Sequence, residues 1–293
     1  MHPSETEVTA ATVPPVTVRL TEHGDPTSGT HVVLLHGYPD DRTLWDDVVA
    51  RLPESWHVVT PDNRGAGRSD APGERAAYDV GLLVEDVLAV VEATVPDGER
   101  FHLVGHDWGS IIGWEVVAAA TRDPRLESRL ASFTSVCGFP LDHLHARLRS
   151  GPDRLALVPQ LLHSWYAFLF CVPALPELLW GPGQGLLRRV GERLDPTAHL
   201  LDWGPALGRA AVPGLGLYRR NVVRRPAAWH TDLPVRVVLA RHDTFIRPVS
   251  LDGLEARCSD HSRVELDTGH WVPRSEPARL ADVVVDHVRA HGG

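Results

Sequence analysis

The segment Gly105-His-Asp-Trp-Gly109 places a carboxylate, that of Asp107, between two glycines. It follows an apolar run at 101–104 and precedes apolar residues at helical spacing, which predicts a strand, a sharp turn and a helix. Such an elbow strains its central residue, and glycines let the flanking backbones pass close together. A serine there would attack a carbonyl carbon, whereas a carboxylate suits displacement at a saturated carbon, such as an epoxide or a carbon–halogen centre. An Asp that only caps the helix would not require both glycines.

Two further polar residues follow predicted strands late in the chain. Asp243 ends one apolar run, and His270 comes shortly after the last one. Because open parallel sheets place ligands beyond the carboxyl ends of their strands, Asp107, Asp243 and His270 are expected to converge. Their order along the chain, nucleophile then acid then histidine, is typical of one layout of hydrolase. Asp267 also lies near His270 in the sequence and remains an alternative acid.

Predicted strands alternate with predicted helices along most of the chain. Strands are expected at 16–20, 31–35, 57–60, 101–104, 130–136, 235–239 and 262–266, and helices at 44–52, 80–95 and 277–290. This alternation is typical of a parallel sheet covered by helices on both faces, so the predicted fold class is α/β.

From about residue 138 to residue 229 the alternation stops. This stretch combines helical patterning with many prolines and aromatic residues. A helical insertion between two strands of one sheet indicates a lid over the carboxyl ends of the strands, and a separate helical domain is the alternative interpretation. The expected organisation is a flexible N-terminus at 1–13, a core made of 14–137 and 230–293, and the lid at 138–229.

Composition excludes several classes of protein. The chain has 293 residues and a formal net charge of −9, which argues against nucleic acid as a partner. Its three cysteines lack ligand spacing and are expected to be free thiols. No apolar run reaches the roughly 18 residues of a membrane span, and residues 1–11 lack the pattern of a signal peptide, so we expect a cytoplasmic protein without a membrane partner. His143 and His145 have no third ligand at metal spacing, so no metal is expected.

Three motifs together resemble the α/β-hydrolase fold family, and specifically its epoxide hydrolase branch. They are Gly105-His-Asp-Trp-Gly109, His36-Gly-Tyr-Pro-Asp40 and Gly269-His-Trp271. The similarity extends over about residues 16–290 and implies an eight-stranded, mostly parallel sheet. The segments 62–69 and 271–277 also resemble bacterial epoxide-hydrolase-type domains, which are sometimes fused to a short-chain dehydrogenase. No glycine-rich dinucleotide loop follows in this chain, so no nicotinamide or other cofactor is expected.

The resemblance implies roles for two lid tyrosines. Epoxide hydrolases direct two phenols at the epoxide oxygen, and Tyr166, a few residues before Pro173, and Tyr218, just before Arg219, match their positions. The implied reaction begins when Asp107 attacks an epoxide carbon and forms an ester, while the phenols donate hydrogen bonds to the alkoxide.

The resemblance also implies the second half of the reaction. His270, oriented by Asp243, would activate a water that hydrolyses the ester, and the backbone amides of Trp108 and Tyr38 would form the oxyanion hole. The expected partners are a small apolar epoxide and water, and the chain is expected to be a monomer or a homodimer. The residues expected to contact the substrate are Trp165, Phe168, Phe170 and His36.

Other functions fit the sequence less well. A haloalkane dehalogenase shares the elbow, but Tyr38 stands where it often has an asparagine, and the lid tyrosines would have no task. A fluoroacetate-type dehalogenase needs arginines after the nucleophile, and residues 108–113 contain none. The nearest match to a serine elbow, Gly67-Arg-Ser-Asp-Ala71, continues into Pro72-Gly73 and not into a helix. The non-enzyme alternative is a catalytically silent hydrolase fold that binds a ligand.

Overall fold

One eight-stranded sheet forms the centre of the molecule in the computed structural model, which describes residues 3–151, 154–223 and 227–292. In their order across the sheet the strands are β1 (Ser4–Ala10), β2 (Val16–His23), β4 (His57–Pro61), β3 (His31–Leu35), β5 (Phe101–His106), β6 (Leu130–Val136), β7 (Val235–Ala240) and β8 (His261–Leu266). β2 runs antiparallel to both of its neighbours, and the pairs from β4 to β8 are parallel. The mostly parallel, eight-stranded sheet expected from the sequence is confirmed.

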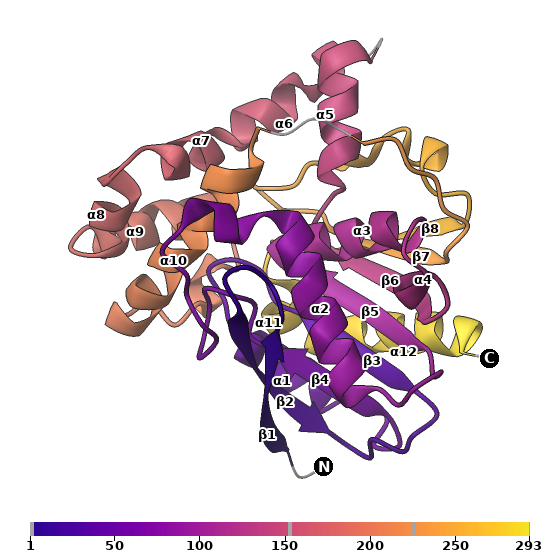
Figure 1. Cartoon of the computed structure of the whole chain (residues 1–293). Helices are drawn as coiled ribbons and strands as arrows, with labels where there is room; N and C mark the ends of the chain where they lie inside the picture. Colours follow the sequence, from indigo (N-terminus) through magenta and orange to yellow (C-terminus); the bar gives the residue numbers. More distant parts are fainter. Residues whose placement is uncertain (1–2, 152–153, 224–226, 293) are drawn as a thin grey trace.

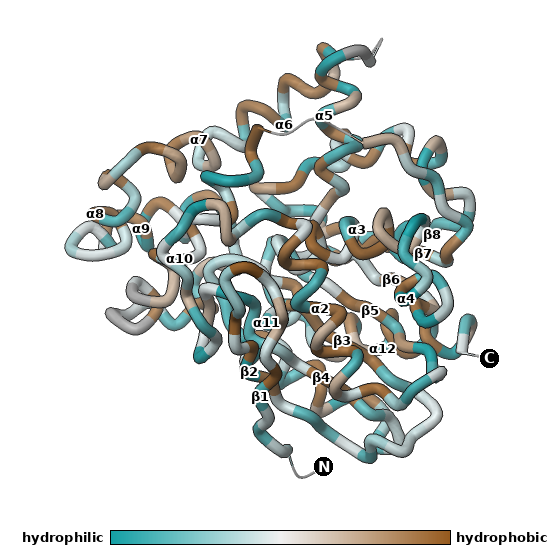
Figure 2. Tube along the Cα trace, in the orientation of Figure 1, coloured by the Kyte–Doolittle hydropathy of each residue, from teal (hydrophilic) through white to brown (hydrophobic). Residues whose placement is uncertain are grey.

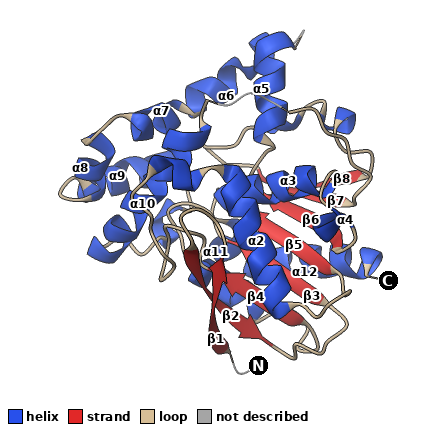
Figure 3. Ribbon diagram, viewed as in Figure 1, coloured by secondary structure: helices blue, strands red, loops and turns tan. Residues whose placement is uncertain are grey.

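Helices cover both faces of this sheet (Figures 1 and 3). The helices of the core are η1 (Arg42–Trp45), α1 (Asp46–Val49), η2 (Arg75–Tyr78), α2 (Val80–Thr94), α3 (Trp108–Ala120), α4 (Pro124–Glu127), η5 (Pro248–Leu251), η6 (Leu254–Ala256), α11 (Val272–Ser275) and α12 (Pro277–His291). Along β3, Val32 and Leu34 belong to the hydrophobic cluster of α1 and α12, whereas Val33 and Leu35 belong to that of α2 and α3. Because alternate side chains face opposite sides, the valines and leucines at 32–35 fill the core on both faces of this strand.

Part of the N-terminal segment that we expected to be flexible forms β1 instead. It pairs with β2 along its whole length, from Ser4 opposite Glu22 to Ala10 opposite Val16. Only Ala10 of this strand is buried, so β1 is held by main-chain pairing at the sheet edge and not by an apolar face. Its charged, threonine-rich sequence therefore carries no hydrophobic pattern that predicts a strand. Residues 1–2 lie outside the described residues.

Between β6 and β7 the chain leaves the sheet and forms a group of helices at one end of it (Figure 1). They are α5 (Leu141–Ser150), η3 (Arg154–Leu157), α6 (Val158–His163), α7 (Trp165–Cys171), α8 (Leu175–Trp180), α9 (Gln184–Leu194), η4 (Ala198–Leu200) and α10 (Pro205–Asn221). Figure 2 shows hydrophobic stretches both along the central strands and along α6 and α7. We refer to these inserted helices as the lid. Among the helices of the described residues, none is long and apolar enough to cross a membrane.

Candidate active site

Asp107 lies at the turn between β5 and α3 with a φ of 52°, a value that residues other than glycine rarely adopt. The two flanking glycines make this turn possible. A Cβ on Gly105 would lie 2.3 Å from the carbonyl oxygen of Gly109, and a Cβ on Gly109 would lie 2.1 Å from that of Leu35. No side chain fits at either position, so the glycines allow the strained turn that presents the carboxylate at the end of the sheet.

The structure brings Asp107, His270 and Asp243 together from three separate loops. His270 Nδ1 lies 2.9 Å from Asp243 Oδ2, and His270 Nε2 lies 3.5 Å from Asp107 Oδ2. The other oxygen of Asp243 accepts hydrogen bonds from the backbone amides of Phe245 and Ile246. All three side chains of this group are buried, and the acid is held firmly on both of its oxygens.

The neighbouring charges set the protonation of His270. Burial alone would lower its pKa, but the carboxylates of Asp243 and Asp107 raise the pKa well above its ordinary value. For Asp243, burial raises the pKa, and the charge and hydrogen bond of His270 outweigh that effect, so the pKa lies below its ordinary value. An imidazolium is therefore favoured while both carboxylates are charged. Asp267, the alternative acid, is exposed and contacts His242 instead.

The main chain fixes one oxygen of the Asp107 carboxylate. The amide of Tyr38 donates a 2.8 Å hydrogen bond to Asp107 Oδ1, and Oδ2 is the oxygen nearest to His270. Gly37 allows this close approach, because a Cβ there would lie 2.5 Å from the Cβ of Asp107. Trp108 follows as the first residue of α3, where amides have no partner within the helix. The Tyr38 amide thus lies at an oxygen that can become an oxyanion, and the role of Trp108 stays a prediction.

Asp107 and His270 border a cavity of about 840 Å³, part of which is open to solvent. Tyr166 from α7 and Tyr218 from α10 line the same cavity, and their rings meet edge to face with centroids 6.1 Å apart. Burial, reinforced by the charge of Asp107, raises the pKa of each phenol above its ordinary value. Both phenols therefore remain protonated at neutral pH and can donate hydrogen bonds into the cavity.

The remaining cavity lining is mostly apolar and comes largely from the lid. It includes Trp165, Leu169, Phe170, Trp180, Leu187 and Val190. Trp165 and Phe170, both expected to contact the substrate, are among these residues. Phe168, which was expected with them, does not line the cavity and is 55% exposed. The reason is the short helix α7, whose opposite sides face the cavity and the surface.

His36 also does not line this cavity, although we expected it to contact the substrate. It is buried just beyond the end of β3, and both ring nitrogens are engaged. Nε2 accepts a 2.9 Å hydrogen bond from the amide of Asn63, and Nδ1 lies 2.8 Å from the carbonyl oxygen of Gly37. His36 therefore ties together the loops after β3 and β4, including the glycine that lets the Tyr38 amide reach Asp107.

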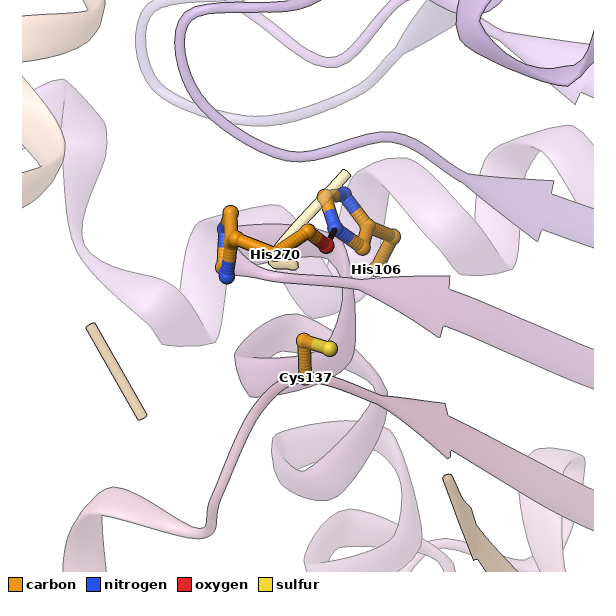
Figure 4. Close-up of side chains that lie close together, drawn as sticks. All are labelled: His106, Cys137 and His270. Carbon is orange, nitrogen blue, oxygen red and sulfur yellow. Dashed lines mark hydrogen bonds between the residues drawn. The ribbon is translucent and has the colours of Figure 1, made fainter. Parts of the chain in front are cut away.

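Two further side chains, those of His106 and Cys137, lie close to His270 (Figure 4). His106 ends β5 and its Nε2 donates a 2.9 Å hydrogen bond to the carbonyl oxygen of His270, and Cys137 follows β6. Burial lowers the pKa of His106 to about 4 and raises the pKa of Cys137 to about 12. The ligand atoms of these three residues lie within 4.8 Å of one another. A metal would need a deprotonated thiol and free nitrogens, so the residues fit a support for the His270 loop better than a metal site.

Asp195 is a buried lid residue that contacts His270 and was not predicted from the sequence. Asp195 Oδ2 accepts a 2.9 Å hydrogen bond from the backbone amide of His270. The pattern Asp195-Pro-Thr197 signals only a local turn. Because the partner is a main-chain group far along the sequence, no spacing of residue types could have predicted this contact.

Known proteins are similar to this chain in both sequence and fold. The family model described as alpha/beta hydrolase fold matches residues 30–168. Over 285 residues the chain is 30% identical to epoxide hydrolase 3 of Mus musculus, a match that covers 88% of this chain and 69% of the mouse protein. The chain belongs to the α/β-hydrolase family, in its epoxide hydrolase branch.

Relatives within the α/β-hydrolase family include longer proteins. The chain is 33% identical over 289 residues to the probable oxidoreductase EphD of Mycobacterium tuberculosis, a match that covers 92% of this chain and 47% of EphD. The chain thus spans about half the length of that relative. Among solved structures, epoxide hydrolase A from Mycobacterium thermoresistibile gives a TM-score of 0.73 at 25% identity, with 98% of each chain covered. An epoxide hydrolase from hot-environment metagenomes gives 0.77 at 22% identity, with 98% of this chain and 99% of that one covered.

Proposed function

We propose that this protein hydrolyses apolar epoxides to vicinal diols through a covalent ester on Asp107. The observation that carries the proposal is a single cavity lined by the elbow carboxylate of Asp107, by His270, which is bonded to Asp243 behind it, and by two lid phenols. The relatives named epoxide hydrolases support the same reaction. A serine-type hydrolase would place a hydroxyl at the elbow and would have no use for the phenols of Tyr166 and Tyr218.

In the first step, the carboxylate of Asp107 attacks one epoxide carbon and the bond between that carbon and the ring oxygen breaks. Because Oδ1 is held by the Tyr38 amide, Oδ2 is the oxygen that is free to attack. Tyr166 and Tyr218 donate hydrogen bonds to the departing oxygen, and one phenol proton completes the new hydroxyl. General acid assistance of this kind is typically worth about 10² to 10⁴ in rate. The imidazolium of His270 then returns a proton to the phenolate.

In the second step, the same histidine becomes a base. Ester formation removes the hydrogen bond between His270 and the Asp107 carboxylate, which is one cause of the raised pKa of His270, so the pKa falls. Neutral His270 takes a proton from water, and the hydroxide attacks the carbonyl carbon of the ester. The oxyanion forms on Oδ1, beside the amides of Tyr38 and Trp108, and losing one such donor typically costs about 2.7 to 4 kcal/mol. Collapse of the intermediate releases the diol and restores the carboxylate.

Mass spectrometry of a His270→Ala variant tests the proposal. After incubation with a panel of apolar epoxides, the peptide that contains Asp107 is expected to gain the mass of the substrate, because the ester forms but is not hydrolysed. An Asp107→Ala, His270→Ala double variant is the matched control and should gain no mass. If the wild-type protein instead leaves epoxides intact and releases halide from a bromoalkane, the alternative dehalogenase function is correct and the proposal is wrong.

A further inference from the structure

A short segment of the lid reaches the two loops that carry Asp243 and His270. This segment, residues 194–197, begins at the last residue of α9 and contributes three hydrogen bonds to those loops. The bonds run from Thr244 Oγ1 to the carbonyl oxygen of Leu194, from the His270 amide to Asp195 Oδ2 at 2.9 Å, and from the Trp271 amide to Thr197 Oγ1 at 3.0 Å. The lid segment is therefore hydrogen-bonded to Thr244, which follows the acid Asp243, and to the main chain of the base, His270.

Asp195 is the centre of this contact. Its side chain is 1% exposed, and within the described parts of the chain no arginine or histidine lies at ion-pair distance from it. Its Oδ1 accepts hydrogen bonds from the amide and the hydroxyl of Thr197, at 2.8 Å and 2.6 Å, and its Oδ2 accepts the His270 amide. Burial of a carboxylate is costly unless it is hydrogen-bonded. Three donors offset the burial here, and one of them belongs to the base.

The fit between this lid segment and the His270 loop is tight. A Cβ on Gly269 would lie 2.4 Å from Asp195 Oδ1 and 2.7 Å from Thr197 Oγ1. The glycine before the histidine is thus explained by the lid carboxylate and not by backbone conformation, since its φ is not in the left-handed region. Any larger residue at 269 would push Asp195 away from the His270 amide.

We propose that Asp195 and Thr197 are positioning residues that hold His270 for hydrolysis of the ester. The inference rests on the proposed function, because it assigns His270 to the second step. α9, the helix that ends at this segment, also lines the cavity with Leu187 and Val190. The helix that borders the substrate is therefore joined directly to the loop of the base. Attack by Asp107 does not use the lone pair of His270, so this lid segment matters for hydrolysis of the ester and not for its formation.

Rapid-quench mass spectrometry of single turnovers separates the two steps and tests the proposal. In Asp195→Ala the hydrolysis rate is expected to fall by about 10²-fold, the effect of misplacing a catalytic group by about 1 Å, while ester formation stays close to wild type. The ester should therefore accumulate. Asp202→Ala is the matched control, because Asp202 is an exposed aspartate of the same lid stretch, and it should leave both rates unchanged.

Smaller changes keep the test decisive if Asp195→Ala does not fold. Thr197→Val removes the acceptor for the Trp271 amide and should also slow hydrolysis selectively, whereas Thr197→Ser should retain the wild-type rate. Equal losses in both steps would show a merely structural role and overturn the proposal, as would no loss at all. A wild-type protein that forms no ester would be recognised before any variant is made, and would contradict the proposed function itself.

Discussion

Two clusters in which buried histidines contact carboxylates lie at opposite ends of the sheet. At the carboxyl ends of the strands, His270 lies between two aspartates. At the amino ends, His31 begins β3 and His57 begins β4, and their Nδ1 atoms lie 2.9 Å apart. The Nε2 atom of His31 lies 2.6 Å from Glu99, and that of His57 lies 3.2 Å from Glu22. Both clusters thus combine buried imidazoles with carboxylates at hydrogen-bond distance.

The difference between the clusters is access and not composition. Both ring nitrogens of His31 and of His57 already have partners, and neither residue lines the cavity. His270 has one nitrogen bonded to its acid, while the other faces Asp107 at 3.5 Å beside the cavity. A histidine can act on a substrate or a water only where one nitrogen can reach it. Buried histidine–carboxylate pairs are therefore candidates for catalysis only where such a nitrogen exists.

The largest expected effect separates the two clusters directly. His270→Ala is expected to reduce steady-state diol formation by about 10⁴- to 10⁶-fold, because the ester is not hydrolysed. His57→Leu, the matched control from the other cluster, should leave turnover close to wild type. Diol formation from an aryl epoxide, measured by chromatography, checks both variants. If both variants fold and lose turnover to a similar extent, the distinction between the two clusters is wrong.

The second-largest loss of turnover is expected when Asp243, the acid of the cluster at the carboxyl ends of the strands, is replaced. Asp243→Asn is expected to reduce turnover by about 10⁴-fold, because the amide no longer holds His270 in the right tautomer or favours its charged form. Asp267→Asn serves as the control, since Asp267 is exposed and contacts His242. Turnover of both variants under the same conditions provides the measurement. A large loss in Asp267→Asn with little loss in Asp243→Asn would reverse the assignment of the acid.

The phenols of Tyr166 and Tyr218 are expected to act in ester formation and not in hydrolysis of the ester. Tyr166→Phe and Tyr218→Phe are each expected to slow ester formation by about 10² to 10⁴, because the departing oxygen loses one hydrogen-bond donor. Tyr78→Phe is the matched control, because Tyr78 is buried and does not line the cavity. Single-turnover rates of ester formation measure the effect. If neither cavity variant changes this rate more than Tyr78→Phe does, the phenols are not the acids.

The pH dependence should differ between the two steps. In the free protein, burial lowers the pKa of His270, but the carboxylates of Asp243 and Asp107 raise this pKa by more. The proposed ester lacks the hydrogen bond to the Asp107 carboxylate, so the pKa of His270 is lower there. Because hydrolysis needs neutral His270, its rate should rise about tenfold per pH unit below that pKa and level off above it. Single-turnover experiments over a pH series should show most ester at acidic pH, and a hydrolysis rate that falls as pH rises would contradict the base role.

The smallest effect on activity belongs to the amino-end cluster, where stability should change instead. His57→Leu is expected to lower the free energy of unfolding by about 1 to 3 kcal/mol, because His31 and Glu22 lose a buried partner. Burial lowers the pKa of His57, so the unfolded chain binds the proton more readily and the wild type should lose stability as pH falls below about 6.5. Urea unfolding at several pH values checks both points, and the variant should show the weaker pH dependence.

The core of the fold could be predicted closely from the sequence. The strands expected at 31–35 and 130–136 coincide with β3 and β6. β3 is a run of valine and leucine after His31, and β6 combines apolar residues with small serine and threonine side chains; both are short segments followed by a glycine two residues after the strand ends. β1 could not be predicted, since its pairing is made by the main chain while its side chains remain largely exposed. The position of His270 after the last strand distinguished it from the other 16 of the 17 histidines in the chain.

The lid could be predicted as helical, but not in orientation. In α7, Trp165-Tyr-Ala-Phe-Leu-Phe-Cys171, nearly every residue is apolar, so no periodicity shows which side faces the cavity. For that reason the sequence could not show that Phe170 lines the cavity and that Phe168 does not. His36 and Asp195 illustrate a second limit. Their contacts involve main-chain amides of distant loops, and such amides leave no trace in the residue types.

A single turnover in oxygen-18 water, with enzyme in excess over epoxide, tests the covalent ester most directly. In the proposed mechanism hydroxide attacks the carbonyl carbon of the Asp107 ester, so the label should enter the Asp107 carboxylate while the diol receives an unlabelled oxygen from the protein. Mass spectrometry of the diol and of the peptide that contains Asp107 measures both. A diol that carries the label after the first turnover, together with an unlabelled Asp107, would show direct attack of water on the epoxide and would contradict the account.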